Sequence, residues 1–382
     1  MSQIDERFPD GAPRSVNELL LEDWLRHAHR MERVTENEMR AIELFLRTEV
    51  LPDLMGRLVT RLERIKSRGY DTGVNTTRRF EDLRRSVLSI VDDGISEAAK
   101  RSLAGLKDVA MYEARWQAAS LERTLQPIIT FNAKLPDPTV LRHLVSERPV
   151  AGFNVGEWWD GLTLDTTKRI EREVRVGLAE GLDVPDIAKR IRGEAATGDG
   201  GVFDVTTRHA RAIVGNAHSA VMNQAREEVY KANDVVKEVV WNAKLDTRTC
   251  PKCGALDGQR FPKGEGPMPP AHPPGPNGGR CRCARNPVTE SWEEFYAKRG
   301  RKVVRKGPAV EKQRASMNGT VPRSMTYSEW LKTLEKEDLV EALGPRRAGI
   351  FERGEVSFDR MVDQSGRFIP LDRLAQIEGI EL

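Results

Sequence analysis

The sequence predicts a mainly α-helical protein that carries a small β-hairpin of the zinc-binding type, and therefore an α+β fold. Apolar residues recur at helical spacing over long stretches, which predicts long N-terminal helices and a helical central domain. All four cysteines of the 382 residues lie between positions 250 and 283, shortly after a run rich in β-branched residues. These features place the β element in the second half of the chain, before a short C-terminal unit.

Length and composition narrow the class of protein. Two or three domains are expected for 382 residues, each with a core of its own. Hydrophobic residues make up 39% of the chain, and no apolar run approaches the roughly 20 residues that span a bilayer, so no membrane role is expected. Residues 1–12 lack the basic and apolar regions of a secretory signal, so we expect synthesis and retention in a cytosol.

Composition shifts and prolines divide the chain into segments. Each proline between positions 136 and 149 disfavours helix in the residue before it, which marks a boundary near residue 149. We expect residues 1–15 to be disordered, 16–148 to form an N-terminal helical domain, 149–298 a central domain with the cysteines, 299–327 a basic linker and 328–382 a C-terminal unit.

Two long helical segments are predicted in the N-terminal domain. Apolar periodicity extends over residues 16–66 and is interrupted at Pro52, which predicts two or three amphipathic helices. A second long helix is predicted for residues 76–125, where Gly94 and Gly105 are weak points because glycine disfavours helix.

The central domain is predicted to change from helix to strand. Helices are expected over residues 165–178, from Val184 onward, and over residues 206–233. The β-branched run 235–242 predicts a strand, and residues 259–261 can form its return strand after a turn. The first cysteine pair then lies in the loop of a β-hairpin.

The cysteines form two close pairs, and this is the chemical centre of the chain. Cys250 and Cys253 have C-x-x-C spacing at the tip of the predicted tight turn, whereas Cys281 and Cys283 have C-x-C spacing. Structural zinc takes four nitrogen or sulfur ligands, and thiols stay reduced in a cytosol, so we predict a structural zinc site in which His272 can replace one sulfur. Disulfides in an oxidising medium and unliganded thiols remain alternatives.

A loop rich in proline and glycine separates the two pairs, from about residue 262 to 279. A structureless loop of this length is unusual inside a compact domain. Zinc ligation at both ends would close it, since binding contributes on the order of 10 kcal/mol in small zinc-binding peptides.

A local basic run offers a second candidate function. The net charge of the whole chain is only +3, which gives no global case for nucleic-acid binding. Between positions 280 and 306, however, the chain contains nine basic and only three acidic residues. Such a run can bind phosphates or serve as a solvated linker. The basic residues are Arg280, Arg282, Arg285, Lys298, Arg299, Arg301, Lys302, Arg305 and Lys306.

No catalytic motif can be placed in the chain. A Walker loop, a nucleophile elbow, an H-E-x-x-H helix and a paired-carboxylate arrangement are all missing from the sequence. Asp246 and Asp257 lie where turns need side-chain acceptors, and His209 and His218 point to opposite sides of one helix. We therefore expect a protein that is not an enzyme.

The residues around the cysteines resemble a known family. The run K-L-D-T-R-T-C-P-K-C-G-A-L-D-G-Q-R-F, followed by G-G-R-C-R-C, is similar to the signature of the phage Mu F-like head-morphogenesis, or minor capsid, proteins of tailed phages. The preceding helix resembles the family pattern at Arg208, Ala210, Ala220, Asn223, Ala225, Arg226 and Tyr230. The segments L-G-P-R-R-A-G-I-F and M-V-D-Q-S-G-R-F-I-P-L resemble a C-terminal part of many members.

The resemblance implies a structural protein of the phage head, made in the host cytoplasm and built into the virion near the portal vertex. Its implied partners are the portal protein, the major capsid or scaffold protein and packaged double-stranded DNA, in head assembly or genome delivery. The loop between Phe261 and Cys281 is longer than the family usually has, which bears on His272 as a ligand. A zinc-stabilised DNA-binding protein and, less expected, a hydrolase or transferase are the alternatives.

Overall fold

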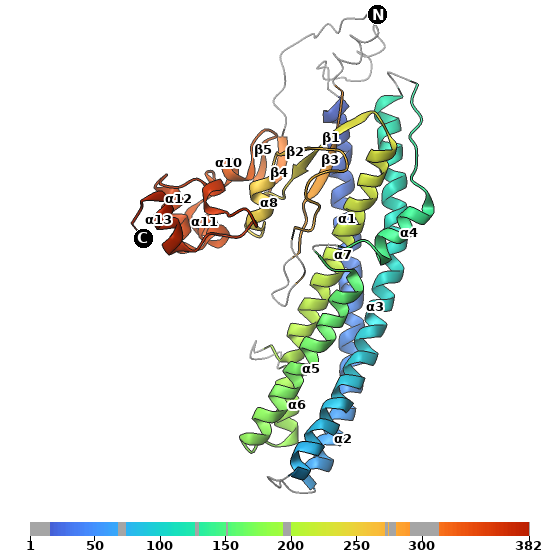
Figure 1. The fold of residues 1–382 in the computed structure, drawn as a ribbon, viewed down its shortest axis with the longest axis vertical. Helices are drawn as coiled ribbons and strands as arrows, with labels where there is room; N and C mark the ends of the chain where they lie inside the picture. The colour runs from blue at the N-terminus through green and yellow to red at the C-terminus, as the bar shows by residue number, and fades with distance from the viewer. Residues whose placement is uncertain are drawn as a thin grey trace, which may run out of the picture.

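In a computed structural model, the protein is an elongated helical bundle with a small sheet beside one half of it and a C-terminal unit that projects to one side (Figure 1). The residues that the structure describes are 16–67, 74–126, 130–149, 152–193, 200–271, 274, 280–290 and 313–381. The predicted α+β class is confirmed, with helix dominating. Within these ranges no helix is both long and apolar enough to cross a membrane.

Within the described residues, seven α-helices and one π-helical turn form the bundle. Pro52 lies in the first turn of the second helix, where its missing N–H costs little, so the interruption predicted there is a helix start. The long helix predicted for residues 76–125 is present with a slightly earlier start. The helices are α1 (Val16–Phe45), α2 (Leu51–Ser67) after the π-helical turn η2 (Leu46–Val50), α3 (Val74–Leu125), α4 (Pro138–Ser146), α5 (Val155–Ala179), α6 (Val184–Arg192) and α7 (Val202–Ala232).

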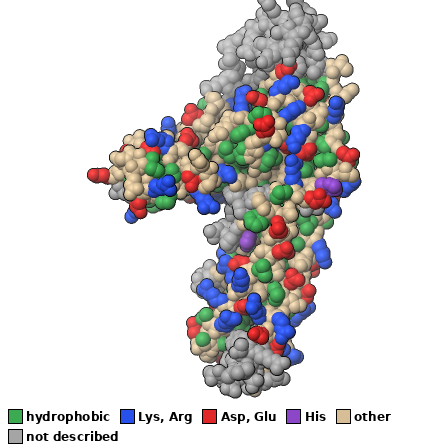
Figure 2. Space-filling view, in the orientation of Figure 1, with side chains coloured by type: hydrophobic (Ala, Val, Ile, Leu, Met, Phe, Trp, Pro, Cys, Tyr) green, Lys and Arg blue, Asp and Glu red, His purple; other side chains and the backbone are tan. Residues whose placement is uncertain are grey.

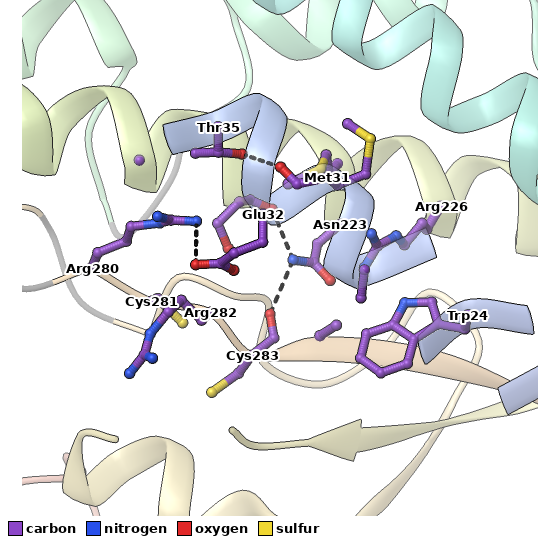
Figure 3. A pocket seen from close by; sticks show the side chains of 15 residues that line it. Trp24, Met31, Glu32, Thr35, Asn223, Arg226, Arg280, Cys281, Arg282 and Cys283 are labelled. Atoms are coloured by element: carbon purple, nitrogen blue, oxygen red, sulfur yellow. Dashed lines mark hydrogen bonds and ion pairs between the residues drawn. The ribbon is translucent and has the colours of Figure 1, made fainter. Parts of the chain in front are cut away.

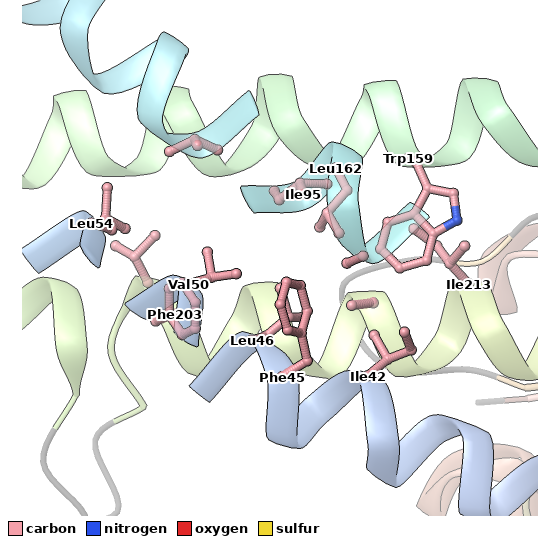
Figure 4. Close-up of a cluster of buried hydrophobic side chains, with 14 of the residues drawn as sticks. Ile42, Phe45, Leu46, Val50, Leu54, Ile95, Trp159, Leu162, Phe203 and Ile213 are labelled. Carbon is pink, nitrogen blue, oxygen red and sulfur yellow. The ribbon is translucent and has the colours of Figure 1, made fainter. Parts of the chain in front are cut away.

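One hydrophobic core joins the N-terminal and central helices. It contains Phe45 and Leu46 from the end of α1 and η2, Ile95 from α3, Trp159 from α5 and Ile213 from α7, all buried (Figure 4). Helices on both sides of residue 149 contribute to this core.

Helix α5 begins about ten residues earlier than expected. Its N-cap is Asn154, whose backbone N–H donates to the Glu157 carboxylate at 2.6 Å, so the chain becomes helical at Val155. Asp165, where the helix was expected to begin, lies inside it.

A buried polar network holds α1, α3 and α7 together toward the sheet end of the bundle. The Glu113 carboxylate contacts His27 Nε2 at 2.7 Å and accepts a hydrogen bond from Arg226 Nε at 2.6 Å. Burial would raise the pKa of Glu113, but the Arg226 charge and the His27 hydrogen bond lower it to about 2. The network therefore keeps a paired carboxylate inside the protein.

The sheet has three antiparallel strands in the order β2-β1-β3. Strand β1 (Val236–Asn242) pairs with β2 (Arg260–Pro262) and with β3 (Ala284–Thr289), so the predicted strand and its return are confirmed. The connection between β1 and β2 contains a short helix, α8 (Pro251–Leu256), with Cys250 at its N-cap. The expected tight turn at the first cysteine pair is thus replaced by helix.

The C-terminal unit folds around its own core. Residues 313–322, expected to be linker, form a hairpin in which Ser316 pairs with Gly319 across a two-residue turn, while residues 299–312 lie outside the described part. The elements are β4 (Gln313–Ser316), β5 (Gly319–Pro322), α10 (Tyr327–Leu331), α11 (Lys336–Leu343), α12 (Pro345–Glu352), η3 (Phe358–Met361) and α13 (Leu371–Glu378). Buried members of the core include Trp330, Phe351 and Phe358, and Leu245 joins them from the central region.

The predicted weak points in α3 have different packing. A Cβ at Gly94 would overlap the rigid, branched side chain of Val50, so glycine allows α3 to approach η2 closely. At Gly105 the nearest atom to such a Cβ is Glu38 Oε2 at 3.8 Å, an ordinary contact distance.

We therefore predict opposite effects for two alanine substitutions in the same helix. Gly94→Ala should lower the free energy of unfolding by about 1–3 kcal/mol, because overpacking outweighs the gain in helix propensity. Gly105→Ala should raise it by about 0.5–1 kcal/mol, because only the propensity gain remains. Urea unfolding monitored by circular dichroism measures both, and equal shifts would contradict the close packing at Gly94.

Candidate metal centre

Three cysteine sulfurs meet in the interior, although the residues lie far apart in the sequence. Cys253 is on α8, and Cys281 and Cys283 lie on the segment that leads into β3. The Sγ atoms of Cys253 and Cys281 are 3.7 Å apart, and all three sulfurs lie within 4.8 Å of one another. All three side chains are buried, and the cysteines form no disulfide. Three of the four predicted ligands are therefore brought together.

Cys250 stands next to this group and is half-buried. Its Sγ accepts a hydrogen bond from the Cys253 backbone N–H at 3.4 Å, at the start of α8. It lies outside the group of three closest sulfurs. The fourth predicted ligand is thus adjacent to the other three and more open to solvent.

The thiols share hydrogen bonds. Donation from the Cys253 and Cys283 thiols holds the pKa of Cys281 below its ordinary value, against the effect of burial. Hydrogen bonds with Cys250 and Cys281 raise the pKa of Cys253. The group therefore favours a thiolate at Cys281, and a thiolate is the form that binds metal.

Two asparagines of α7 fix the second cysteine pair. Asn216 Oδ1 accepts the Cys281 N–H at 3.0 Å, and Asn223 Nδ2 donates to the Cys283 carbonyl at 3.3 Å. They are seven residues apart, and positions two helical turns apart share a face. Asn223 belongs to the family pattern on this helix, whereas the sequence analysis did not identify Asn216.

The three described arginines of the basic run turn inward. Arg280 points toward Glu32 of α1, 3.1 Å from its carboxylate (Figure 3). Arg282 Nη2 donates to Asp246 Oδ1 at 2.8 Å, and Arg285 is 1% exposed. These guanidinium groups are held by acids and carbonyls of the same chain. Arg299, Arg301, Lys302, Arg305, Lys306 and His272 lie outside the described residues.

Comparison with known families gives a match to this region. Residues 168–285 match the family model described as "Phage Mu protein F like protein". This part of the chain is Mu F-like. No curated protein and no solved structure matches the chain.

The Mu F-like region extends from α5 to the start of β3 and contains all four cysteines. The resemblance inferred from the residues is confirmed there, and it points to a phage head-morphogenesis protein. The C-terminal segments that also resemble the family, after residue 328, lie beyond the matched range.

Arg285 organises the proline-rich loop of the Mu F-like region. Its guanidinium donates to the Glu265 carbonyl at 2.5 Å and to the Pro267 carbonyl at 3.4 Å, and its Nε lies 3.7 Å from a Glu227 carboxylate oxygen. The Gly264 N–H donates to the same glutamate. A buried ion pair therefore orders the first part of the loop, in addition to any effect of the thiols.

The acids near the thiols have structural roles. Asp246 Oδ1 accepts the Arg248 N–H at 3.1 Å, as expected for a turn acceptor. Asp257 Oδ1 accepts the Ala243 N–H at 2.8 Å, and its other oxygen bonds partners in the C-terminal unit. Neither His209 nor His218 belongs to the thiol group. The arrangement can hold a metal in a closed, buried site.

His218 provides a test of the packing between α1 and α7. It is buried beside Thr35, and burial, assisted by the Arg280 charge, lowers its pKa to about 4. Between pH 4 and 6.5 the unfolded chain therefore binds a proton that the folded chain does not. The free energy of unfolding should rise with pH across this window, by up to about 3 kcal/mol.

Urea unfolding at several pH values checks this prediction. His218→Gln should flatten the rise, whereas His143→Gln, at a side chain that is 65% exposed on α4, should leave the rise unchanged. A wild-type stability that does not vary between pH 4 and 6.5 would contradict the burial of a neutral imidazole.

Proposed function

We propose that this chain is a structural minor capsid protein of a tailed phage, built into the head near the portal vertex and acting in head assembly or genome delivery. The observation that carries the proposal is the Mu F-like match over residues 168–285, which includes both cysteine pairs. The buried acids and arginines around the thiols support a structural role, because their side chains are used in internal contacts.

We propose zinc as the metal of the thiol group. Zinc prefers four sulfur or nitrogen ligands in a closed structural site, and three buried sulfurs with a fourth beside them suit that preference. Its role would be to hold the Mu F-like region together. A closed, sulfur-rich site does not suit catalysis, which needs an open position for substrate or water.

The shape of the bundle supports contacts with large neighbours. The 52-residue α3 extends roughly 80 Å at 1.5 Å per residue, so one molecule offers a long lateral surface. The proposed partners along it are the portal protein and the major capsid or scaffold protein.

Contact with packaged DNA is proposed for the basic run beyond the described residues. Arg280, Arg282 and Arg285 are held inside, which leaves Arg299, Arg301, Lys302, Arg305 and Lys306 as candidates. On the face of the bundle in Figure 2, basic and acidic side chains alternate, a pattern that favours protein neighbours over a continuous phosphate track.

Purified phage particles test the proposal. Quantitative mass spectrometry of gradient-purified virions should detect this chain at a copy number at or below that of the portal protein. An abundant host cytosolic protein, measured in the same samples, controls for carry-over. Depletion of the chain to the level of that control would contradict a place in the virion.

A further inference from the structure

The C-terminal unit attaches to the rest of the protein through the segment that carries the first cysteine pair. Asp257 Oδ2 accepts the Tyr327 N–H at 2.8 Å and a hydrogen bond from Arg314 Nη1 at 2.9 Å. The Met317 N–H donates to the Leu245 carbonyl at 2.9 Å. The Asp257 side chain is fully buried, so this contact is an interior one.

Helix α8 itself is the docking surface. A Cβ on Gly254 would lie 2.5 Å from Tyr327 Cδ1 and 2.9 Å from the Phe358 ring, so the aromatic core of the C-terminal unit rests directly on the helix backbone. Lys252 packs in the same way against Gly366. Cys253, between Lys252 and Gly254, faces the other thiols. One short helix therefore carries a sulfur ligand and bears the C-terminal unit.

The partner sulfurs are fixed to the helical bundle. Asn216 and Asn223 of α7 hold the backbone of Cys281 and Cys283, as described above. The sulfurs of Cys253 and Cys281 thus lie between α8, which holds the C-terminal unit, and α7 of the bundle.

We propose that a thiophilic divalent metal bound by Cys250, Cys253, Cys281 and Cys283 controls the docking of the C-terminal unit on α8. With the metal bound, α8 is tied to α7 and presents Gly254 and Asp257 to the unit. Without it, the direct link between α8 and the segment held by α7 is reduced to contacts between thiols, and the unit separates more readily. The proposal concerns the isolated chain and holds whether or not the chain is found in virions.

Thermodynamic linkage makes the coupling measurable from both sides. If metal binding favours docking by some factor, docking must favour metal binding by the same factor. Couplings between sites in proteins are commonly about 5- to 150-fold. A substitution that weakens docking, at a residue that is not one of the four cysteines, should therefore also weaken the affinity for the metal.

The first experiment uses the full chain loaded with Zn²⁺ and then treated with a chelator. Native mass spectrometry measures the zinc stoichiometry. Hydrogen exchange measures the protection of peptides that contain Met317 and Tyr327, whose amides donate hydrogen bonds from the C-terminal unit to the rest of the chain. Chelation should reduce protection of these peptides at least about fivefold. Peptides from the middle of α3 serve as the internal control and should not change. Unchanged protection at Met317 and Tyr327 after zinc is removed would overturn the proposal.

The second experiment changes the docking contact and measures the metal. Arg314→Met removes the partner of Asp257, and zinc affinity, measured by competition with a chromophoric chelator, should fall about 5- to 150-fold. Arg353→Met is the matched control, since Arg353 pairs with Glu355 on the surface of the same unit. Equal zinc affinities in the two variants would overturn the coupling. If Arg314→Met does not fold, the chelation experiment on the wild-type chain decides.

Discussion

The approach of Cys253 to Cys281 is the contact on which the rest of this structure depends. Their sulfurs lie 3.7 Å apart, one on α8 and the other on the segment that enters β3. The first residue belongs to the surface that carries the C-terminal unit, and the second is hydrogen-bonded to α7 through Asn216. The bundle and the C-terminal unit have separate hydrophobic clusters. The group of thiols therefore lies where these two parts of the molecule are joined.

Buried ion pairs surround this junction, and they fix the positions of the segments that carry the cysteines. Breaking one partner of a buried ion pair commonly costs about 3–5 kcal/mol, because the other charge is left uncompensated. Arg282 with Asp246 and Arg314 with Asp257 are pairs of this kind. They restrict where the cysteine-bearing segments can lie, so the sulfurs are brought close before any metal is considered. Such preorganisation suits a site whose role is to hold elements in place.

Much of the fold was predictable because helical periodicity is local. The stripes of apolar residues identified α1, α3 and α7, and the β-branched run identified β1. The features that the sequence did not reveal depend on long-range contacts. Gly94 allows α3 to pack closely against Val50. Asn216 is important only because it accepts a hydrogen bond from Cys281, which lies 65 residues away in the sequence. The charge of Arg280, Arg282 and Arg285 suggested an exposed basic run, and only the folded chain places acids around them. The hairpin at 313–322 was missed although Asn318-Gly319 is a turn signal, because its polar composition suggested a linker.

The ligands of a bound zinc ion reveal whether the four thiols meet at one metal. X-ray absorption at the zinc edge, on the full chain loaded with one equivalent of Zn²⁺, reports the type and distance of the ligands. We expect a first shell of four sulfurs at about 2.3 Å. A shell made mainly of oxygen or nitrogen would contradict it, because the metal would then lie away from the junction formed by Cys250, Cys253, Cys281 and Cys283.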